Sequence, residues 1–212
     1  MKNTLLYKLL QWSYYFCINN FFALKGFFIG NNKPFKIDGL FFNFPKSHLR
    51  DIGKRFQAYE AAERYMVRNY LSQNDIVLEL GACIGVVSCV TNAKLNLSSN
   101  HVVVEPNPRM LQLLVKNRDL NKAQFLIEQC VISIQKEIKF FIYDDYMSSS
   151  LIQRSNRKGQ QEVLVKGMSV EELSVKTKLK FNALIMDIEG GELDIIKNTD
   201  LSPFNKLIIE YH

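Results

Sequence analysis

The chain has 212 residues, which is enough for one well-buried α/β domain with a short extension but too few for two domains of ordinary size. Its apolar share of 47% and charged share of 23% lie in the globular range and exclude wholesale disorder and a membrane bundle. Polar residues interrupt the apolar N-terminal stretch before it reaches the roughly 20 residues of a membrane span, and no cleavage site follows it. Neither a span nor a cleaved signal peptide is therefore expected.

The positive charge lies in the first third of the chain. Residues 1–70 hold 11 Lys or Arg and 4 Asp or Glu (+7), which leaves 16 and 17 (−1) for the remainder of the net +6. The same segment is rich in aromatic residues, a combination found at membrane surfaces, at nucleic acids and in segments that cover a neighbouring domain. We expect residues 1–55 to form such a cap and residues 56–212 to form the main domain. Peripheral membrane contact by the N-terminal segment stays open.

Four cysteines, Cys17, Cys83, Cys89 and Cys130, show neither the paired spacing of a zinc site nor the density of a secreted disulfide framework. Three of them lie in apolar runs, where a thiol usually packs as a small hydrophobic side chain. The cysteines therefore predict reduced thiols in a cytoplasmic protein.

From residue 76 onward, short apolar runs alternate with helical patterns, which indicates a parallel sheet with crossover helices. We expect an α/β, doubly wound, Rossmann-like fold. Asn107 and Ser169 stand where helix caps are expected, and Glu172 completes a capping box with Ser169. The predicted strands are 76–80, 101–105, 124–132, 183–188 and 206–212, with an antiparallel strand 138–143 at the rim of the sheet. Helices are predicted over 85–95, from 108, over 170–176 and after 191, and an exposed loop over 147–161.

A turn bracketed by two glycines follows the first predicted strand. Gly81 and Gly85 are separated by three residues, whereas dinucleotide-binding turns have the pattern G-x-G-x-x-G, so NAD is not expected. We expect S-adenosylmethionine instead. Gly81, Ala82 and Gly85 let the backbone approach the cofactor closely, and Glu79 supplies negative potential near its cationic end.

Polar residues recur at or just past the carboxyl ends of the later strands, where ligands bind in doubly wound sheets: Glu105, Asp187 with Glu189, and Glu210 with His212. Glu105 is placed to accept both ribose hydroxyls in charge-assisted hydrogen bonds. Asn107 is predicted to line the adenine slot together with Cys130 and Val131 at the end of the third strand. Pro106 completes this predicted cofactor-binding set.

Carboxylates and a histidine at the ends of the last two predicted strands are candidates for a general base or for metal ligands. Asp187 is our first choice as base, with Glu189 beside it and His212 opposite, and Asp187 also belongs to the predicted cofactor site. Asp187 and Glu189 could instead hold a divalent metal. Two carboxylates alone do not establish a metal site, so no metal ligand is assigned.

Four segments resemble successive motifs of the FkbM-like methyltransferases: VLELGACIG (77–85), VEPNP (104–108), IMDIEGGE (185–192) and IIEYH (208–212). Tyr59 and Glu60 resemble the helix before that family's core, so the resemblance covers about residues 59–212 and makes Glu60 a wall of the cofactor site. It implies a class I methyltransferase that uses S-adenosylmethionine to methylate a hydroxyl oxygen of a sugar, glycolipid or natural product. Glu79 replaces the more usual aspartate, and Cys83 stands where asparagine is common.

The sequence ends after the fifth predicted strand, without the antiparallel pair that usually completes this sheet. The alternative to an O-methyltransferase is therefore a binding or scaffold protein that keeps the fold without catalysis. An open fifth strand would favour a homodimer. We expect a small-molecule or glycan acceptor. Nucleic acid is not expected, because the Asn/Asp-Pro-Pro-aromatic motif of amino-group methylation is absent.

Overall fold

The computed structural model describes residues 33–45, 56–144, 149–151 and 159–212. The chain divides into two compact units, Met1–Tyr59 and Glu60–His212. Most of the predicted N-terminal cap, Cys17 and much of the predicted loop 147–161 lie outside the described residues. Among the helices that are described, none is both long enough and apolar enough to cross a membrane.

The described part of the first unit contains a small hairpin and an aromatic cluster. The Phe44 ring meets the rings of Phe35 and Tyr59 edge-on, with centroids 5.5 and 5.3 Å apart. Edge-to-face pairs of this kind stabilise packing beyond the area that they bury. Some of the aromatic residues in this segment therefore pack within their own unit. The elements are β1 (Phe35–Ile37), β2 (Leu40–Phe42), antiparallel to β1, and the 3-10 helix η2 (Phe56–Ala58).

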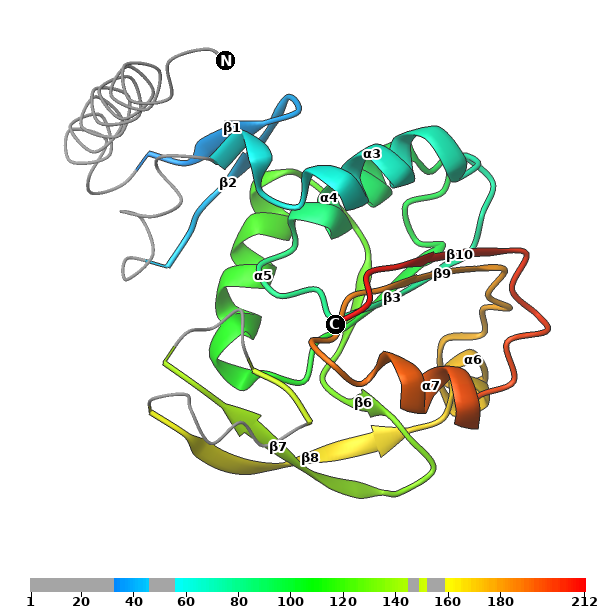
Figure 1. Ribbon diagram of the computed structural model, residues 1–212. Helices are drawn as coiled ribbons and strands as arrows, with labels where there is room; N and C mark the ends of the chain where they lie inside the picture. Colours follow the sequence, from blue (N-terminus) through cyan, green and yellow to red (C-terminus); the bar gives the residue numbers. More distant parts are fainter. Residues whose placement is uncertain (1–32, 46–55, 145–148, 152–158) are drawn as a thin grey trace, which may run out of the picture. The chain divides into compact units, whose positions relative to one another are not determined.

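A five-stranded parallel sheet forms the centre of the second unit (Figure 1). The strand order is β10-β9-β3-β4-β5, and every pairing is parallel, so the direction of winding switches between β3 and β9. This confirms the predicted parallel α/β sheet. The strands are β3 (Val77–Leu80), β4 (His101–Val104), β5 (Leu126–Glu128), β9 (Ala183–Met186) and β10 (Lys206–Ile209).

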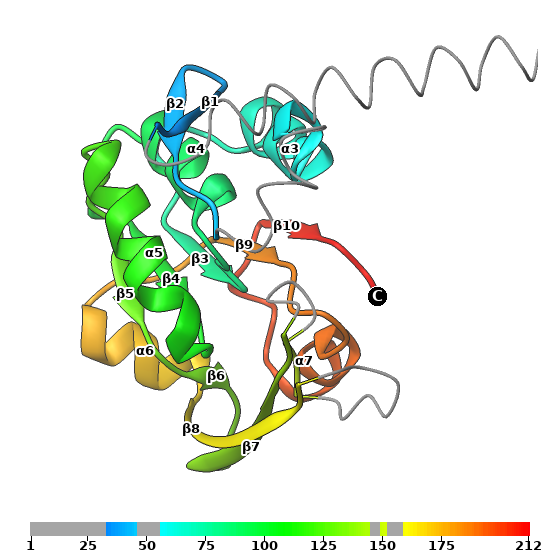
Figure 2. The same cartoon turned by 90° about the vertical axis from the view of Figure 1, so that its left-hand side faces the viewer.

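Helices cover both faces of this sheet. Figures 1 and 2 show α3 and α4 on one side and α6 and α7 on the other, and α5 packs beside α4. The helices are α3 (Ala61–Tyr70), α4 (Val86–Lys94), α5 (Pro108–Leu120), α6 (Val170–Thr177) and α7 (Glu192–Asn198). Both predicted caps are present: Asn107 accepts the Arg109 N–H at 3.0 Å, and Ser169 and Glu172 form the capping box.

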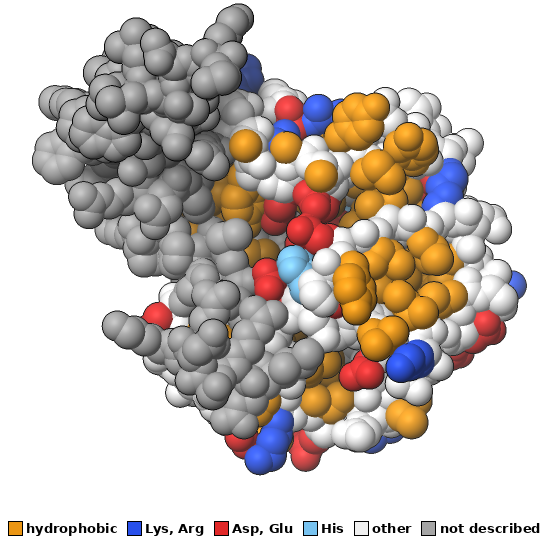
Figure 3. Space-filling view, in the orientation of Figure 1, with side chains coloured by type: hydrophobic (Ala, Val, Ile, Leu, Met, Phe, Trp, Pro, Cys, Tyr) orange, Lys and Arg blue, Asp and Glu red, His pale blue; other side chains and the backbone are white. Residues whose placement is uncertain are grey.

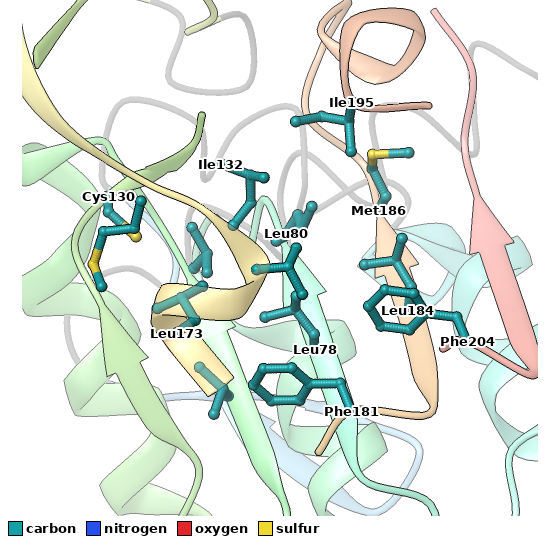
Figure 4. Close-up of a cluster of buried hydrophobic side chains, with 14 residues drawn as sticks. Leu78, Leu80, Cys130, Ile132, Leu173, Phe181, Leu184, Met186, Ile195 and Phe204 are labelled. Atoms are coloured by element: carbon teal, nitrogen blue, oxygen red, sulfur yellow. The ribbon is translucent and has the colours of Figure 1, made fainter. Parts of the chain in front are cut away.

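An extended apolar core lies between the sheet and the helices α6 and α7 (Figure 4). Leu78 and Leu80 of β3 pack there with Leu184 of β9 and Leu173 of α6. Alternate residues of a strand point to opposite faces of the sheet. Glu79, between the two leucines, therefore points to the face that α4 covers.

The prediction of a single strand over 124–132 is wrong. β5 ends at Glu128, because the Cys130 N–H donates to the Glu128 carbonyl at 3.1 Å and turns the chain out of the main sheet. The following β6 (Val131–Ile132) pairs with β8 (Gln161–Met168), which sequence analysis missed. The predicted strand 138–143 is present as β7 (Glu137–Ile142), but it pairs with β8 in a separate three-stranded sheet rather than at the rim of the main one (Figure 1).

Candidate active site

In the turn from β3 to α4, the backbone at Gly81 lies directly against the backbone of Asp187, just after β9. Gly81 has a φ of 86°, and a Cβ atom there would lie 1.7 Å from the carbonyl oxygen of Asp187, so only glycine fits. The Gly81 N–H donates to Val104 and the Asp187 N–H donates to Leu80, both at 3.0 Å. The turn is thereby fixed at the switch point of the sheet, where doubly wound folds bind their ligands.

A buried asparagine holds the other end of this turn. Asn117 of α5 is fully buried and donates its Nδ2–H to the carbonyl of Ile84 at 2.9 Å. Gly85 follows with a φ of 84°, and Leu114 packs against it. Sequence analysis missed Asn117. Asn117 lies one helical turn after Leu114, on the apolar face of the predicted helix, and a polar residue at such a position could have been predicted to be buried and hydrogen-bonded.

Glu105 closes the turn from the side of β4. Its Oε2 accepts the Cys83 N–H at 2.6 Å and its Oε1 accepts the Asn107 N–H at 2.7 Å. The side chain is 5% exposed, and burial raises its pKa to about 7, although both hydrogen bonds lower it. Each carboxylate oxygen keeps a second lone pair, which is what the predicted contact with two ribose hydroxyls requires. Pro106 lies in the same turn, and the Asn107 side chain donates to Ser149 at 3.2 Å.

Cys130 and Val131 lie in apolar clusters. Cys130 packs in the main core, and burial raises the pKa of its thiol to about 12, so it packs as a neutral side chain. Val131 packs with Phe140 and Val165 in a smaller core at the three-stranded sheet. Their assignment to the adenine slot stays a prediction.

A small hollow, partly open to solvent, lies at the carboxyl ends of β3 and β9. Its described lining contains four acidic residues and five apolar or glycine residues, and neither lysine nor arginine. Figure 3 shows acidic side chains and a histidine gathered on this face, with apolar side chains around them. A concave surface of one charge sign concentrates ligands of the opposite sign. The lining residues are Glu60, Glu63, Glu79, Leu80, Gly81, Ala82, Val87, Ile185 and Asp187.

Asp187 and His212 form a hydrogen-bonded pair at this hollow. The Asp187 Oδ1 lies 3.0 Å from the His212 Nε2. Burial raises the pKa of Asp187, although the hydrogen bond to His212 lowers it. Burial lowers the pKa of His212, but the bond to Asp187 and the charges of Glu189 and Glu210 outweigh it, so the pKa is raised. Asp187 therefore takes up a proton at a higher pH than a free carboxyl group does. His212 likewise keeps its proton to a higher pH than a free imidazole does.

Glu63 of α3 brings a further carboxyl group to the Asp187–His212 pair through Glu210. Its hydrogen bond to Glu210 raises the pKa of Glu210 to about 7, and burial and the charge of Asp187 act in the same direction. Two carboxyl groups can hydrogen-bond to each other only when one of them holds a proton. Sequence analysis placed Glu210 at a strand end but missed Glu63, because it lies on a helix before the first strand of the sheet.

The acidic groups that could bind a metal differ from the predicted pair. Asp187, Glu210 and His212 each offer one ligand atom, and the three atoms lie within 4.8 Å of one another. Oxygen and imidazole ligands of this kind suit several divalent ions. Glu189 does not belong to this group. It lies in the following turn with a φ of 58° and acts on Asp187 and His212 through its charge.

A second glutamate, which sequence analysis did not assign, holds that turn in place. Glu192 is buried at the start of α7, and its Oε1 accepts the N–H groups of Ile188 and Gly190 at 3.3 and 3.0 Å. The turn that follows Asp187 is thus fixed from the helix side.

A parallel α/β sheet with a glycine turn and acidic strand ends at its switch point is compatible with a Rossmann-like methyltransferase. Residues 79–212, more than half of the chain, match the methyltransferase FkbM domain. The chain belongs to the FkbM methyltransferase family, and a methyltransferase family in general implies S-adenosylmethionine as the methyl donor. No curated protein matches the chain. The matched range begins at Glu79, so Glu60 and Glu63 lie before it.

Proposed function

We propose that this protein is an S-adenosylmethionine-dependent O-methyltransferase that acts on a hydroxyl group of a sugar, glycolipid or natural product. The observation that carries the proposal is the Asp187–His212 pair beside the acidic hollow. S-adenosylmethionine supplies, when bound, an electrophilic methyl group on a positively charged sulfur. The acidic lining favours such a cation, and Gly81 permits close approach of the backbone.

Asp187 and His212 act together on the proton of the acceptor. With its Nε2–H donated to Asp187, the His212 ring keeps Nδ1 as an acceptor for the hydroxyl proton. A bound S-adenosylmethionine would supply the methyl group and keep the bonding electrons on sulfur as the neutral S-adenosylhomocysteine, and the Asp187–His212 pair would hold the proton that the acceptor hydroxyl gives up. Asp187 orients the ring and stabilises the charge that the ring gains.

Tyr211 supports a sugar or another ring-bearing acceptor. It lies between Glu210 and His212 in the chain, and its side chain is 69% exposed. An exposed aromatic ring next to His212 in the chain offers an apolar surface and a hydroxyl group to a ligand. The loops around a site of this fold vary with the acceptor, so the sheet itself does not fix which hydroxyl is methylated.

Two measurements on the full chain test the proposal. Calorimetric titration with S-adenosylmethionine should show binding, and a labelled-methyl assay against pooled sugars, lipids and polyketide alcohols should then show transfer. Asp187→Asn should abolish transfer, whereas Glu162→Gln, which removes a carboxylate on β8, should leave it unchanged. A folded protein that does not bind the cofactor would sink the enzyme proposal. Binding without transfer to any pool would favour the scaffold alternative, and full activity of Asp187→Asn would remove the proposed base.

A further inference from the structure

A buried polar network lies beneath the glycine turn and takes no part in the proton transfer described above. Glu79 is 2% exposed, although it borders the hollow. Its Oε1 accepts the hydroxyl hydrogen of Ser88 at 2.5 Å, and its Oε2 lies 3.0 Å from the Nε2 of His101. Both carboxylate oxygens are thus held by side chains from other elements.

The register of the sheet and the placement of α4 bring these three residues together. Val77 of β3 lies opposite His101 of β4, so Glu79 and His101 are diagonal neighbours on one face of the sheet. Ser88 lies in the first turn of α4, which covers this face. The network therefore joins the first strand, the second strand and the helix that follows the cofactor turn.

The two ring nitrogens of His101 differ in their surroundings, and this difference indicates which of them carries the proton. His101 is fully buried, and its Nδ1 has no hydrogen-bond partner in the part of the chain that the structure describes. A proton on Nδ1 would be buried without an acceptor, which is costly for a neutral ring and more so for a cation. The tautomer with its proton on Nε2 donates to Glu79 and is neutral. His101 consequently fixes the carboxylate without cancelling its negative charge.

We propose that His101 and Ser88 are positioning residues that hold Glu79 as a fixed carboxylate whose uncancelled charge favours the sulfonium cofactor over its neutral thioether product. The inference rests on the proposed use of S-adenosylmethionine. S-adenosylhomocysteine lacks the transferred methyl group and the positive charge on sulfur. A fixed negative charge beside the hollow therefore binds the donor more tightly than the product, and it favours product release after each transfer.

Binding of both ligands to variants of the full chain tests the proposal. His101→Leu removes one of the two donors, so that only Ser88 still holds the Glu79 carboxylate in its place beneath the turn. Its affinity for S-adenosylmethionine should fall about tenfold more than its affinity for S-adenosylhomocysteine, since only the sulfonium loses a charge partner. His101→Gln places an amide N–H near the position of Nε2 and should restore the wild-type ratio of the two affinities. Ser88→Ala, which removes the other donor, should lower the ratio as well.

The matched control is Thr91→Val. Thr91 is fully buried one turn after Ser88 on α4, and its hydroxyl has no partner among the described residues, so valine should change neither affinity. If His101→Leu lowers the affinities for both ligands by the same factor, or if His101→Gln behaves like His101→Leu, then His101 contributes only to packing and does not position Glu79. If His101→Leu does not fold, an unchanged ratio in Ser88→Ala overturns the proposal. A wild-type protein that does not bind the cofactor at all refutes the proposed function instead.

Discussion

At the scale of single residues, Glu105 should link cofactor binding to proton release. Its pKa of about 7 in the free protein means that roughly half of these carboxyl groups hold a proton near pH 7. Two ribose hydroxyls that donate to the carboxylate favour its ionised form, so binding lowers the pKa and expels the proton. We predict that affinity for S-adenosylmethionine rises with pH up to about 7.5 and then levels off. Calorimetry in buffers of different ionisation enthalpy should detect about half a proton released at pH 7.

Glu105→Gln is the variant that assigns this proton. It has no group to titrate, and its amide nitrogen faces one of the backbone N–H groups of Cys83 and Asn107, so both the proton release and the affinity should fall. The variant matters because Asp187 also has a raised pKa and lies at the same hollow. Proton release that persists in full in Glu105→Gln would assign it to the other carboxyl groups.

The Glu63–Glu210 pair gives a second prediction at this scale. The hydrogen bond from Glu63 is the largest cause of the raised pKa of Glu210, and the charge of Glu63 adds to it. We predict that Glu63→Gln lowers the pKa of Glu210 from about 7 towards its ordinary value of 4.5, because the amide can donate to the ionised carboxylate. A carbon-13 NMR titration of the Glu210 carboxyl carbon measures this directly. An unchanged midpoint would show that Glu63 is not its partner, and Glu162→Gln serves as the unaffected control.

At the scale of elements, the turn from β3 to α4 should tolerate alanine at one glycine far better than at the other. Both Gly81 and Gly85 have a positive φ, which costs alanine about 1–2 kcal/mol. At Gly81 the added Cβ also collides with the backbone oxygen of Asp187, whereas at Gly85 it meets the end of the flexible Leu114 side chain, 2.5 Å away. We predict that Gly81→Ala costs about 3 kcal/mol or more of unfolding free energy and that Gly85→Ala costs less. Urea unfolding of both variants measures these losses of free energy. A larger loss in Gly85→Ala than in Gly81→Ala would contradict the prediction.

The elements that the sequence predicted well are those that depend on local chemistry. β3, β4 and β9 are buried on both faces and are largely apolar, with Glu79 and His101 as the exceptions, and Asn107 caps α5 through its own side chain. The run 124–132 also reads as one strand, but Glu128 and Gln129 interrupt it, and a hydrogen bond between backbone groups of Glu128 and Cys130 divides it there. The residues of β8 do not strictly alternate between polar and apolar, and its pairing with β7 is long-range, so no local pattern identified it.

At the scale of the whole molecule, the site joins residues that are far apart in the chain. The rule that ligands bind at strand ends identified Glu105, Asp187 and Glu210. It did not identify Glu63 or Asn117, because both lie on helices and not at strand ends. The same limit hid the roles of Ser88 and His101, whose partner Glu79 lies between two core leucines.

The described lining of the hollow belongs entirely to the unit Glu60–His212, which predicts where the cofactor protects the backbone. A ligand that binds the native state suppresses openings of its site by RT ln(1 + [L]/Kd), about 2.7 kcal/mol at 100 times Kd. Amide hydrogens that exchange through local openings should therefore slow in the turn 81–85 and in the segments that follow β4 and β9. Those of β7 and β8, in the separate sheet, should exchange at their original rates.

Hydrogen exchange followed by mass spectrometry, with and without S-adenosylmethionine, measures this pattern. Adenosine is the matched control ligand, because it carries the ribose diol but neither the sulfonium nor the amino-acid group. It should protect the segment that follows β4, where Glu105 lies, and leave the turn at Gly81 unprotected. Protection by S-adenosylmethionine that was confined to β7 and β8 would place the cofactor outside the hollow. Equal protection of every segment would mean that exchange proceeds through global unfolding, and exchange at lower temperature would then separate the local openings from the global one.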